Sequence, residues 1–441
     1  MKVLVVGAGV VGVTTAWFLS RQGFEVVVVD RGQEPASETS FANGGQISVS
    51  HAEPWANPKA LQRAARWLLR ADAPLRLRLR VDPRQWLWLA RFARECTNER
   101  TQHNIGELVR LGTYSRKVLQ LLRTDTGISY DEQLRGILHF YTDAREFEAA
   151  HEPARLMREF GCERSIVSVD EAIAIEPALR SARSLLVGAT FTPADESGDA
   201  HAFAVQLARL CRAAGVEFRL GHQVTALRTS GGRIEHVEAI SPEGGYETIR
   251  AQRYVLAAGS FSPLLAAPIG IRLAVYPAKG YSVTMPVRDA ARAYQVSLTD
   301  DERKLVFSRL GDRLRIAGTA ELAGYGRALD LNRCRAILRR IEQLMPGAGD
   351  TTAATFWSGL RPSTPSNLPY VGGTCVPNLF LNTGHGTLGW TLACGSAKAL
   401  ADLMAGRQPD VDYAFCGPAS PPGRTTAVPE TIPRCKPPKS S

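Results

Sequence analysis

The first thirty residues change from a β-branched run to a helical spacing of apolar residues and back again. Residues 2–6 and 25–30 are short runs rich in valine, which is typical of buried strands. Between them, apolar residues over 10–22 recur at helical spacing, and Gly23 follows directly. The pattern predicts a strand, a helix and a second, parallel strand, because a helical crossover returns the chain to the same end of a sheet.

The chain continues to alternate between helical and strand-like patterns up to about residue 405. Further helices are predicted over 104–124, 146–160, 201–214, 332–345 and 390–405, and further strands over 136–142, 185–192, 217–220, 224–227 and 254–258. Gly231 and Gly232 predict a hairpin turn. Alternating apolar residues over 273–285 and 304–317 are typical of antiparallel strands, so we expect these two segments in a separate sheet.

Three glycines between the first strand and the first helix form a phosphate-binding fingerprint. In this pattern Gly7 turns the chain, Gly9 lets the backbone approach a pyrophosphate, and Gly12 permits close helix packing. The helix N-terminus then attracts the phosphates. Asp30 ends the second strand, where a carboxylate binds ribose hydroxyls and repels a 2′-phosphate, and Arg31 follows it. The fingerprint predicts a dinucleotide but does not separate FAD from NAD.

A small, polar, glycine-containing loop soon after the second strand is suited to bring backbone close to a bulky planar group. It consists of Ser40, Phe41, Ala42, Asn43, Gly44, Gly45 and Gln46. With the fingerprint, this loop resembles the D-amino acid oxidase superfamily of flavoproteins, and its order of residues is especially similar to the bacterial D-amino acid dehydrogenases. The resemblance implies FAD as the cofactor. It also implies that the Val224 backbone meets the adenine and that Ala258 and Gly259 lie near the cofactor.

The resemblance implies an α/β fold in which a Rossmann-type FAD-binding domain, with a parallel sheet, is interleaved with a second, mixed α+β substrate domain. We expect the FAD-binding domain to consist of residues 1–58, 199–266 and 352–416, and the substrate domain of residues 59–198 and 267–351. Residues 417–441 are rich in Pro, Ser and Thr with almost no apolar cluster. We expect this tail to be disordered, because it cannot offset its ordering entropy.

Three later segments extend the resemblance. Gly359 and Arg361, which precedes a proline, are similar to the family's carboxy-terminal signature, in which the arginine binds the substrate carboxylate. A planar guanidinium suits that role, because it can form two parallel hydrogen bonds with a carboxylate. Tyr281 lies on a segment similar to the strand that lines the substrate side, where its hydroxyl would bind the carboxylate or close the pocket. Flavin contacts are expected at His385, Gly386, Thr387, Leu388 and Gly389.

The implied reaction is oxidative deamination of D-amino acids to 2-oxo acids and ammonia. A hydride passes from the substrate α-carbon to flavin N5, and water hydrolyses the imino acid. The helix over 390–405 would point its positive N-terminal end at the flavin pyrimidine and stabilise the incoming negative charge. The cofactor carries the difficult step. We expect the electrons to continue to a quinone or another carrier.

Composition and charge limit the partners. The chain has 441 residues, 44% hydrophobic, and Lys and Arg exceed Asp and Glu by 53 to 43, a net charge of +10 that favours anionic ligands. The eight cysteines lack the close pairs of zinc sites or redox dithiols, so we expect no metal and a reducing compartment. No stretch approaches the roughly 20 apolar residues of a membrane span. We expect a small amino acid substrate and a cytoplasmic protein.

An arginine- and tryptophan-rich segment leaves contact with the inner face of the plasma membrane open. It contains Arg63, Arg66, Trp67, Arg70, Arg76, Arg78, Arg80, Arg84, Trp86, Trp88, Arg91 and Arg94. Such a segment either rests on anionic lipid or forms a solvated basic face.

Three other functions stay open from the sequence. A secondary-amine, glycine, sarcosine or hydroxyproline oxidase or dehydrogenase of the same superfamily would share every motif above. A non-catalytic flavoprotein that binds RNA through a basic surface is an alternative of another class, although no RNA-binding motif supports it and we expect no nucleic acid partner. An NAD-dependent dehydrogenase would not require the late glycine segments.

Overall fold

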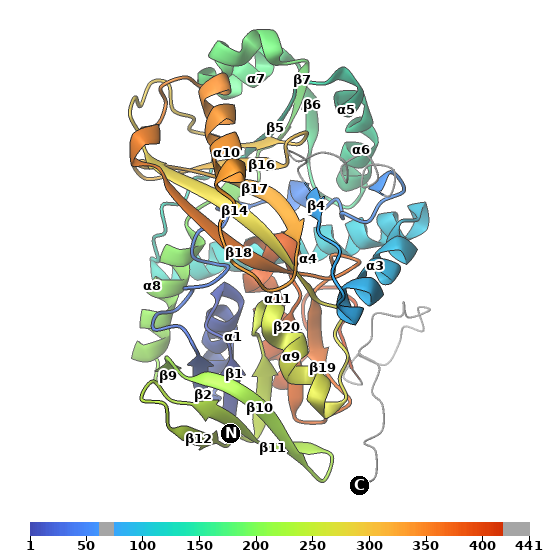
Figure 1. Ribbon diagram of the computed structural model, residues 1–441, viewed down its shortest axis with the longest axis vertical. Helices are drawn as coiled ribbons and strands as arrows, with labels where there is room; N and C mark the ends of the chain where they lie inside the picture. The colour runs from blue at the N-terminus through green and yellow to red at the C-terminus, as the bar shows by residue number, and fades with distance from the viewer. Residues whose placement is uncertain (61–74, 418–441) are drawn as a thin grey trace.

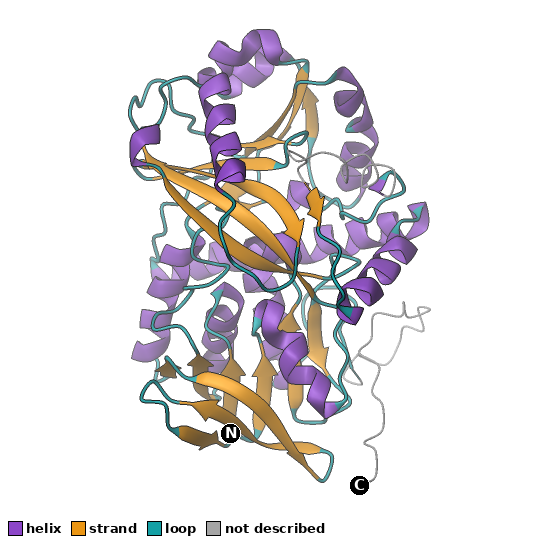
Figure 2. Cartoon of the chain, in the orientation of Figure 1, coloured by secondary structure: helices purple, strands orange, loops and turns teal. Residues whose placement is uncertain are grey.

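The computed structural model describes residues 1–60 and 75–417. Figure 1 shows an elongated molecule with a parallel sheet in its lower half and a larger sheet in its upper half. Figure 2 shows helices on the outer faces of both sheets, with irregular segments crossing between the two halves. The chain passes repeatedly from one half to the other, so each half is assembled from separate segments.

The lower sheet has the order β19-β20-β13-β1-β2-β9. Its strands are β1 (Lys2–Val6), β2 (Glu25–Asp30), β9 (Glu217–Leu220), β13 (Arg253–Leu256), β19 (Tyr370–Gly373) and β20 (Leu379–Thr383). All neighbours pair in parallel except β19 and β20. The valine-rich runs of β1 and β2 are buried on both faces, as parallel strands covered on two sides require. The predicted Rossmann-type sheet is confirmed.

Helices cover one face of this sheet and a small antiparallel sheet covers the other. The helices are α1 (Val10–Arg21), α8 (Ala200–Ala213) and α11 (Gly389–Met404), with α4 (Asn98–Thr126) packed against α11. The small sheet consists of β10 (Gln223–Ser230), β11 (Arg233–Ile240) and β12 (Tyr246–Ile249). Its first two strands form the hairpin predicted at Gly231 and Gly232. The carboxyl ends of β1 and β2 face the second half of the molecule, because Val6 and Asp30 border the same cavity as Arg361 of the upper sheet.

The upper sheet has the order β18-β14-β17-β16-β15-β5-β7-β6, with β4 also paired to β17. Its strands are β4 (Leu75–Leu77), β5 (Ile137–Tyr141), β6 (Ser165–Val167), β7 (Gly188–Thr192), β14 (Tyr276–Pro286), β15 (Ser297–Asp300), β16 (Leu305–Leu310), β17 (Arg313–Leu322) and β18 (Thr355–Ser363). The helix α10 (Leu331–Leu344) packs on it and shares an apolar core with β14, β16 and β17. The two predicted antiparallel segments thus lie together in a separate sheet, as expected.

Short elements complete the fold. They are the strands β3 (Gln46–Ile47) and β8 (Glu196–Ser197), the helices α3 (Pro83–Glu95), α5 (Ala144–Ala149), α6 (His151–Glu159), α7 (Val169–Ile175) and α9 (Ser262–Ala266), and the 3₁₀ helices η1 (Val49–His51), η2 (Pro177–Leu185), η3 (Gly259–Phe261), η4 (Ala267–Ile269), η5 (Thr351–Ala353) and η6 (Gly386–Leu388).

Three predicted elements differ from the structure for local reasons. The single helix predicted over 146–160 is divided into α5 and α6, because Pro153 cannot donate a backbone hydrogen bond to Ala149. The strand predicted over 185–192 begins only at Gly188, after η2. The helix predicted over 104–124 extends further in both directions, from the side-chain cap of Thr97 to the left-handed Gly127.

The division into two domains stays a prediction. One strand, β18, lies in the other sheet from the one that the predicted boundaries imply. Residues 352–363 were assigned to the FAD-binding domain, but β18 pairs with β14 along its whole length in the upper sheet. The strand β14 pairs with β17 on one side and with β18 on the other, and the local sequence of residues 352–363 does not show which strand they will pair with. The predicted disordered tail lies, from residue 418 on, outside the described residues.

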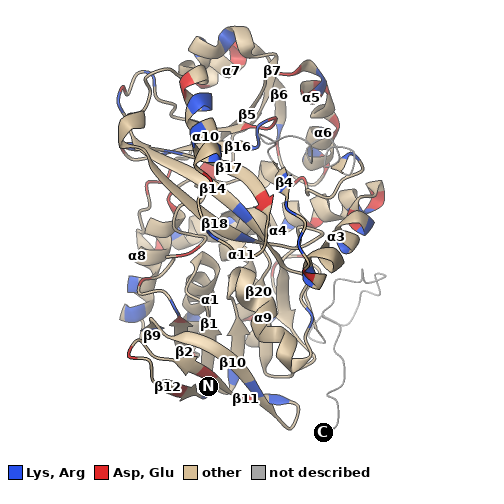
Figure 3. Ribbon diagram, viewed as in Figure 1, with Lys and Arg blue, Asp and Glu red and all other residues tan. Residues whose placement is uncertain are grey.

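Part of the arginine- and tryptophan-rich segment is engaged within the protein. Trp88 is buried and donates to the Ser363 carbonyl, Arg76 lies 3.6 Å from Asp330, and Arg78 pairs with the buried Glu321. Four members of the segment, residues 63, 66, 67 and 70, lie outside the described residues. In the view of Figure 3 basic residues are spread over several elements, α3 and α10 among them. No helix within residues 1–60 and 75–417 is long and apolar enough to cross a membrane.

Candidate active site

A cavity of about 640 Å³ is lined by residues of both sheets. That volume lies within the range of roughly 300–1,000 Å³ typical of small-molecule sites. The predicted site residues that border it are Gly7, Gly9, Asp30, Arg31, Ser40, Asn43, Gly44, Gly45, Gln46, Val224, Ala258, Gly259, Tyr281, Gly359, Arg361, His385, Gly386, Thr387, Leu388 and Gly389. Of the predicted set, Gly12 alone does not border it. The fold therefore gathers segments from both ends of the chain around one space.

The glycine fingerprint forms an open helix N-terminus at the cavity wall. Gly7 has a φ of +115°, and a Cβ there would lie 2.5 Å from the Ala257 carbonyl oxygen. A Cβ on Gly12 would lie 1.9 Å from the Gly7 oxygen, so Gly12 serves packing, as predicted. Gly9 caps α1 without a side-chain hydrogen bond, and Ser40 Oγ accepts from the Val10 amide at 3.1 Å. The remaining amides and the helix dipole fit a pyrophosphate.

Asp30 ends β2 at the cavity, in the position expected for a ribose ligand. Its two carboxylate oxygens accept from the amides of Ala8 and Gly32, each at 2.7 Å. Burial, the largest influence, raises the pKa of Asp30, while the two amides oppose that effect. Arg31 pairs with Glu38 at 2.8 Å, which keeps its guanidinium beside the cavity wall.

The loop over 40–46 is clamped between the two sheets. Asn43 Oδ1 accepts from the Gly45 amide at 2.9 Å, which closes a local turn. The Gly44 carbonyl accepts from Ser308 Oγ at 2.7 Å, and a Cβ on Gly44 would lie 2.3 Å from Val306 Cγ2. Gln46 Nε2 donates to Ser297 Oγ at 3.0 Å. The glycine is therefore required by close approach to β16.

The last helix, α11, points its N-terminus at the cavity, because residues 386–391 all border it. No side chain caps this end, and its first turn contains no acidic residue. A negative charge that develops in the cavity would be stabilised by the helix dipole. His385 faces away into the helix: its Nε2 lies 3.0 Å from Ser396 Oγ, and burial lowers its pKa to about 3. The neutral imidazole therefore shapes the turn, and its backbone lines the site.

Arg361 places a partly buried guanidinium in the same cavity. It lies on β18 opposite Ala278, and it crosses Gly280 so closely that a Cβ there would meet Cζ at 2.5 Å. Its Nη1 donates to the Thr319 carbonyl at 2.7 Å. Among the described residues no carboxylate forms an ion pair with it, and burial alone lowers its pKa to about 10. A cation held in a cavity without a counterion is suited to bind an anionic ligand.

Tyr281 borders the cavity, but its hydroxyl has another partner. It donates to Glu321 Oε2 at 2.7 Å, and the ring packs in the apolar cluster beneath α10. Lys279 lies 3.2 Å from the same carboxylate. Successive side chains of β14 alternate between faces, which sets Tyr281 on the face opposite the Gly280 position that Arg361 crosses. The predicted carboxylate contact of Tyr281 stays a prediction.

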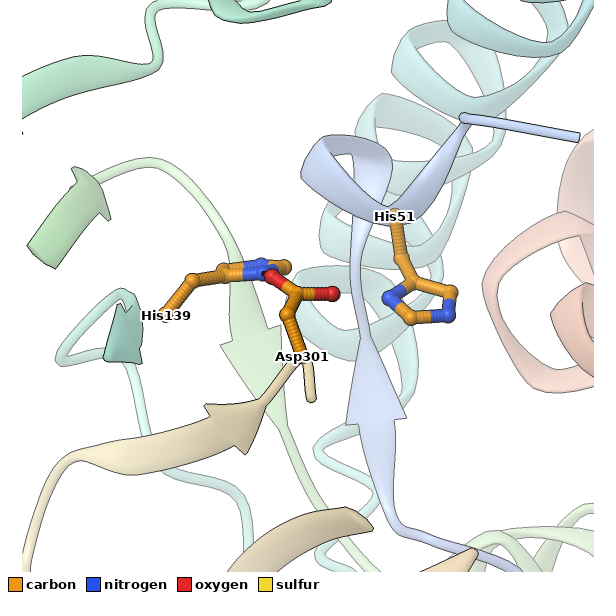
Figure 4. Close-up of side chains that lie close together, drawn as sticks. All are labelled: His51, His139 and Asp301. Carbon is orange, nitrogen blue, oxygen red and sulfur yellow. Dashed lines mark hydrogen bonds and ion pairs between the residues drawn. The ribbon is translucent and has the colours of Figure 1, made fainter. Parts of the chain in front are cut away.

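Three side chains that the sequence did not single out gather on the cavity wall (Figure 4). Potential ligand atoms of His51, His139 and Asp301 lie within 4.8 Å of one another. His139 Nδ1 lies 2.8 Å from Asp301 Oδ2, and its Nε2 lies 3.0 Å from a serine hydroxyl. Arg164 and Lys304 approach Asp301 to 3.6 and 3.4 Å. Because both nitrogens of His139 are engaged and two cations flank the carboxylate, the cluster suits a polar wall better than a metal ion.

Comparison with known proteins identifies the family. The chain matches the profile described as DAO, FAD dependent oxidoreductase, over residues 2–403. It belongs to this family. Similar relatives include D-amino acid dehydrogenases of Dechloromonas aromatica, 56% identical over 94% of this chain and 99% of the relative, and of Paramagnetospirillum magneticum, 53% identical over 92% and 96%. FAD, the cofactor that the resemblance implied, is the cofactor of this family.

Two solved structures have the same overall fold as this chain. Glycine oxidase from Geobacillus kaustophilus superposes with a TM-score of 0.71 at 22% identity, covering 93% of this chain and 96% of that chain. L-proline dehydrogenase from P. horikoshii gives a TM-score of 0.71 at 17% identity, covering 91% and 92%. At these identities the likeness concerns the fold alone. The predicted α/β flavoprotein architecture is confirmed.

Proposed function

We propose that the protein catalyses FAD-dependent oxidative deamination of D-amino acids to 2-oxo acids and ammonia. The proposal rests on the position of Arg361, whose partly buried guanidinium has no carboxylate partner among the described residues and lies in the cavity that Gly7 and Gly9 also border. The two most similar relatives described above are named D-amino acid dehydrogenases and match this chain over nearly their whole length.

The residues of this chain supply orientation and electrostatics. When bound, FAD supplies the acceptor for the hydride that leaves the substrate α-carbon. Arg361 binds the substrate carboxylate and fixes the α-carbon relative to the ring. The uncapped N-terminus of α11 stabilises the negative charge that arrives with the hydride. Gly7 and Gly9 admit the pyrophosphate, and Asp30 binds the ribose.

Product analysis with a panel of amines tests this assignment. Purified holoenzyme with an artificial electron acceptor should produce pyruvate and ammonia from D-alanine, and much less from L-alanine, sarcosine or proline derivatives. The panel decides between D-amino acids and secondary amines, because the shape of the pocket sets that preference while the flavin site is shared. Turnover confined to sarcosine or proline derivatives would replace the proposal with the secondary-amine alternative.

We further infer that the electrons pass to a quinone or another carrier at a membrane surface. The turn and helix over 79–87 expose Leu79, Val81, Trp86 and Leu87 by 56, 106, 51 and 50%. Arg80 and Arg84 lie among them. Apolar side chains beside cations are the composition of a surface that rests on anionic lipid.

Vesicle sedimentation tests that surface. Wild-type protein should sediment with phosphatidylglycerol vesicles, and Val81→Asp should reduce the bound fraction several-fold. The matched control is Tyr246→Asp, which removes an 86% exposed aromatic ring from β12, a strand at the lower left of Figure 1 and away from α3. Equal binding of the two variants, or wild-type protein that remains in the supernatant, would support a solvated basic face instead.

A further inference from the structure

The guanidinium of Arg361 lies over two neighbouring strands of the upper sheet. It crosses β14 at Gly280 and donates to the Thr319 carbonyl of β17 at 2.7 Å. Residues of a strand advance by about 3.3 Å each, so the residues next to Thr319 along β17 lie close to the guanidinium. What these residues contact shows what surrounds a carboxylate that Arg361 binds.

The two directions along β17 lead to different walls of the cavity. On one side, Ala317 meets the loop over 40–46, because a Cβ on Gly44 would lie 3.8 Å from the Ala317 Cβ. On the other side, Ala320 pairs with Leu75 of β4, which lies beside β17 in Figure 1. A ligand of Arg361 therefore lies between the loop expected at the flavin and the strand β4.

Leu75 lies on the same face of the sheet as Arg361. Ala278 is directly opposite Arg361 in the pairing of β14 with β18, so these two side chains share a face. Ala278 is buried in an apolar cluster, and Leu75 packs against that cluster. The next residue of β4, Arg76, points to the other face, where it lies 3.6 Å from Asp330. The side chain of Leu75 is therefore directed to the side of the sheet on which Arg361 binds its ligand.

Two aromatic side chains extend this part of the cavity wall. Trp55 and Phe92 pack against the same apolar cluster as Leu75, and all three residues border the cavity. All three are only partly buried. Phe92 is held in place by the buried Trp88, with ring centroids 5.2 Å apart. A ligand that covers this apolar surface gains binding free energy in proportion to the area removed from water.

A carboxylate, that of Glu53, also borders the cavity near this wall. Its side chain is exposed, and Asn57 Nδ2 donates to it at 3.4 Å. An ion pair with an exposed carboxylate contributes little binding free energy. The wall therefore favours an uncharged, apolar side chain over a cationic one.

We propose that Trp55, Leu75 and Phe92 form the subsite for the substrate side chain, and that the protein prefers D-amino acids with long apolar side chains. Arg361 binds the carboxylate, and the side chain extends from β17 toward β4. Neighbouring strands lie about 4.8 Å apart, a distance that a side chain of the size of norleucine can span. The inference rests on the proposed function, because it takes the ligand of Arg361 to be the carboxylate of an amino acid.

A series of straight-chain substrates tests the subsite in wild-type holoenzyme. The kcat/KM, measured with an artificial electron acceptor, should rise from D-alanine through D-2-aminobutyrate and D-norvaline to D-norleucine. Burial of each added methylene should raise it roughly fourfold. D-Lysine has the same four-carbon chain with an ammonium group at its end, and its kcat/KM should be at least roughly tenfold below that of D-norleucine, because the charge loses its water.

Leu75→Ala and Leu77→Ala separate the subsite from the packing of β4. Both leucines pack against the same cluster from one strand, but Leu75 borders the cavity and Leu77 does not. The ratio of kcat/KM for D-norleucine to kcat/KM for D-alanine should fall roughly tenfold in Leu75→Ala and stay within roughly twofold of wild type in Leu77→Ala. The ratio cancels any common effect on folding or flavin content.

A kcat/KM that does not rise from D-alanine to D-norleucine in wild-type protein would overturn the proposal. Equal changes of the ratio in the two alanine variants would also overturn it, because they would trace the effect to packing. A higher kcat/KM for D-lysine than for D-norleucine would overturn it in favour of a cationic side chain bound at Glu53. Failure of the proposed function has a different signature, since no member of the series would then reduce the flavin of wild-type holoenzyme.

Discussion

Replacing Arg361 with methionine should raise the stability of the apoprotein. The guanidinium donates only to the carbonyls of Gly318 and Thr319 among the described residues, and burial lowers its pKa to about 10. Keeping the charge there costs on the order of 3 kcal/mol. Methionine has a similar length, fills the same space and has no charge to desolvate. We therefore expect the free energy of unfolding to rise by about 1–2 kcal/mol, part of the gain being lost with the two hydrogen bonds.

The same substitution should nearly abolish catalysis. Truncating one partner of a hydrogen-bonded charge pair costs about 2–5 kcal/mol, which corresponds to a loss of kcat/KM of roughly 30- to 4,000-fold. Arg361→Lys is the matched control, because it keeps a positive charge but cannot form the two parallel bonds, and its activity should lie between those of methionine variant and wild type. Flavin content should be similar in all three proteins.

Two assays on the same preparations test the expected changes in stability and in catalysis. Denaturant unfolding of the apoproteins gives the change in stability, and anaerobic reduction of the flavin by D-alanine gives the change in catalysis. A methionine variant that is less stable and still fully active would contradict the substrate-binding role of Arg361, because Arg361 would then be a structural residue. Opposite changes in stability and activity are the expected result.

Three further predictions concern the cofactor loops and acid stability. Gly12→Ala places a Cβ 1.9 Å from the Gly7 oxygen, so the variant should purify almost free of flavin; full flavin content, measured from the absorption spectrum, would contradict this. Gly44→Ala should weaken FAD binding through its clash with Val306, and adding Val306→Ala should restore it; a double variant without rescue would exclude that cause. The pKa of His385 is about 3 in the folded protein and about 6.5 when unfolded. Between these values the unfolded chain binds the proton more readily, so the stability that the neutral imidazole contributes is complete above about pH 6.5 and falls as the pH falls toward 3. His385→Gln should therefore flatten the acid unfolding profile over this range, whereas an unchanged profile would count against a neutral buried imidazole.

The beginning of the lower sheet, from β1 through α1 to β2, could be predicted because its signals are local, whereas β19 and β20 were not predicted. The fingerprint of Gly7, Gly9 and Gly12 joins a strand to a helix within a few residues, and the valine runs on either side fix the period of the adjacent elements. The resemblance of the later segments then led to Arg361, which the structure places at the cavity.

Other parts of the site depend on contacts between distant segments. The face of β14 on which Tyr281 lies depends on one residue of register, which local sequence does not fix. The extra residue that β17 contains between Gly318 and Glu321 has no sequence signal of its own either. His51, His139 and Asp301 come from three segments far apart in the chain, so no spacing could have grouped them. The partner strand of β18 was missed for the same reason.

The decisive measurement is the flavin absorption spectrum of the purified holoenzyme before and after anaerobic addition of D-alanine. We expect a yellow protein whose flavin absorption bleaches with D-alanine, far less with L-alanine, and much more slowly when Arg361 is methionine. A colourless protein, or a flavin that stays oxidised with every D-amino acid offered, would contradict it.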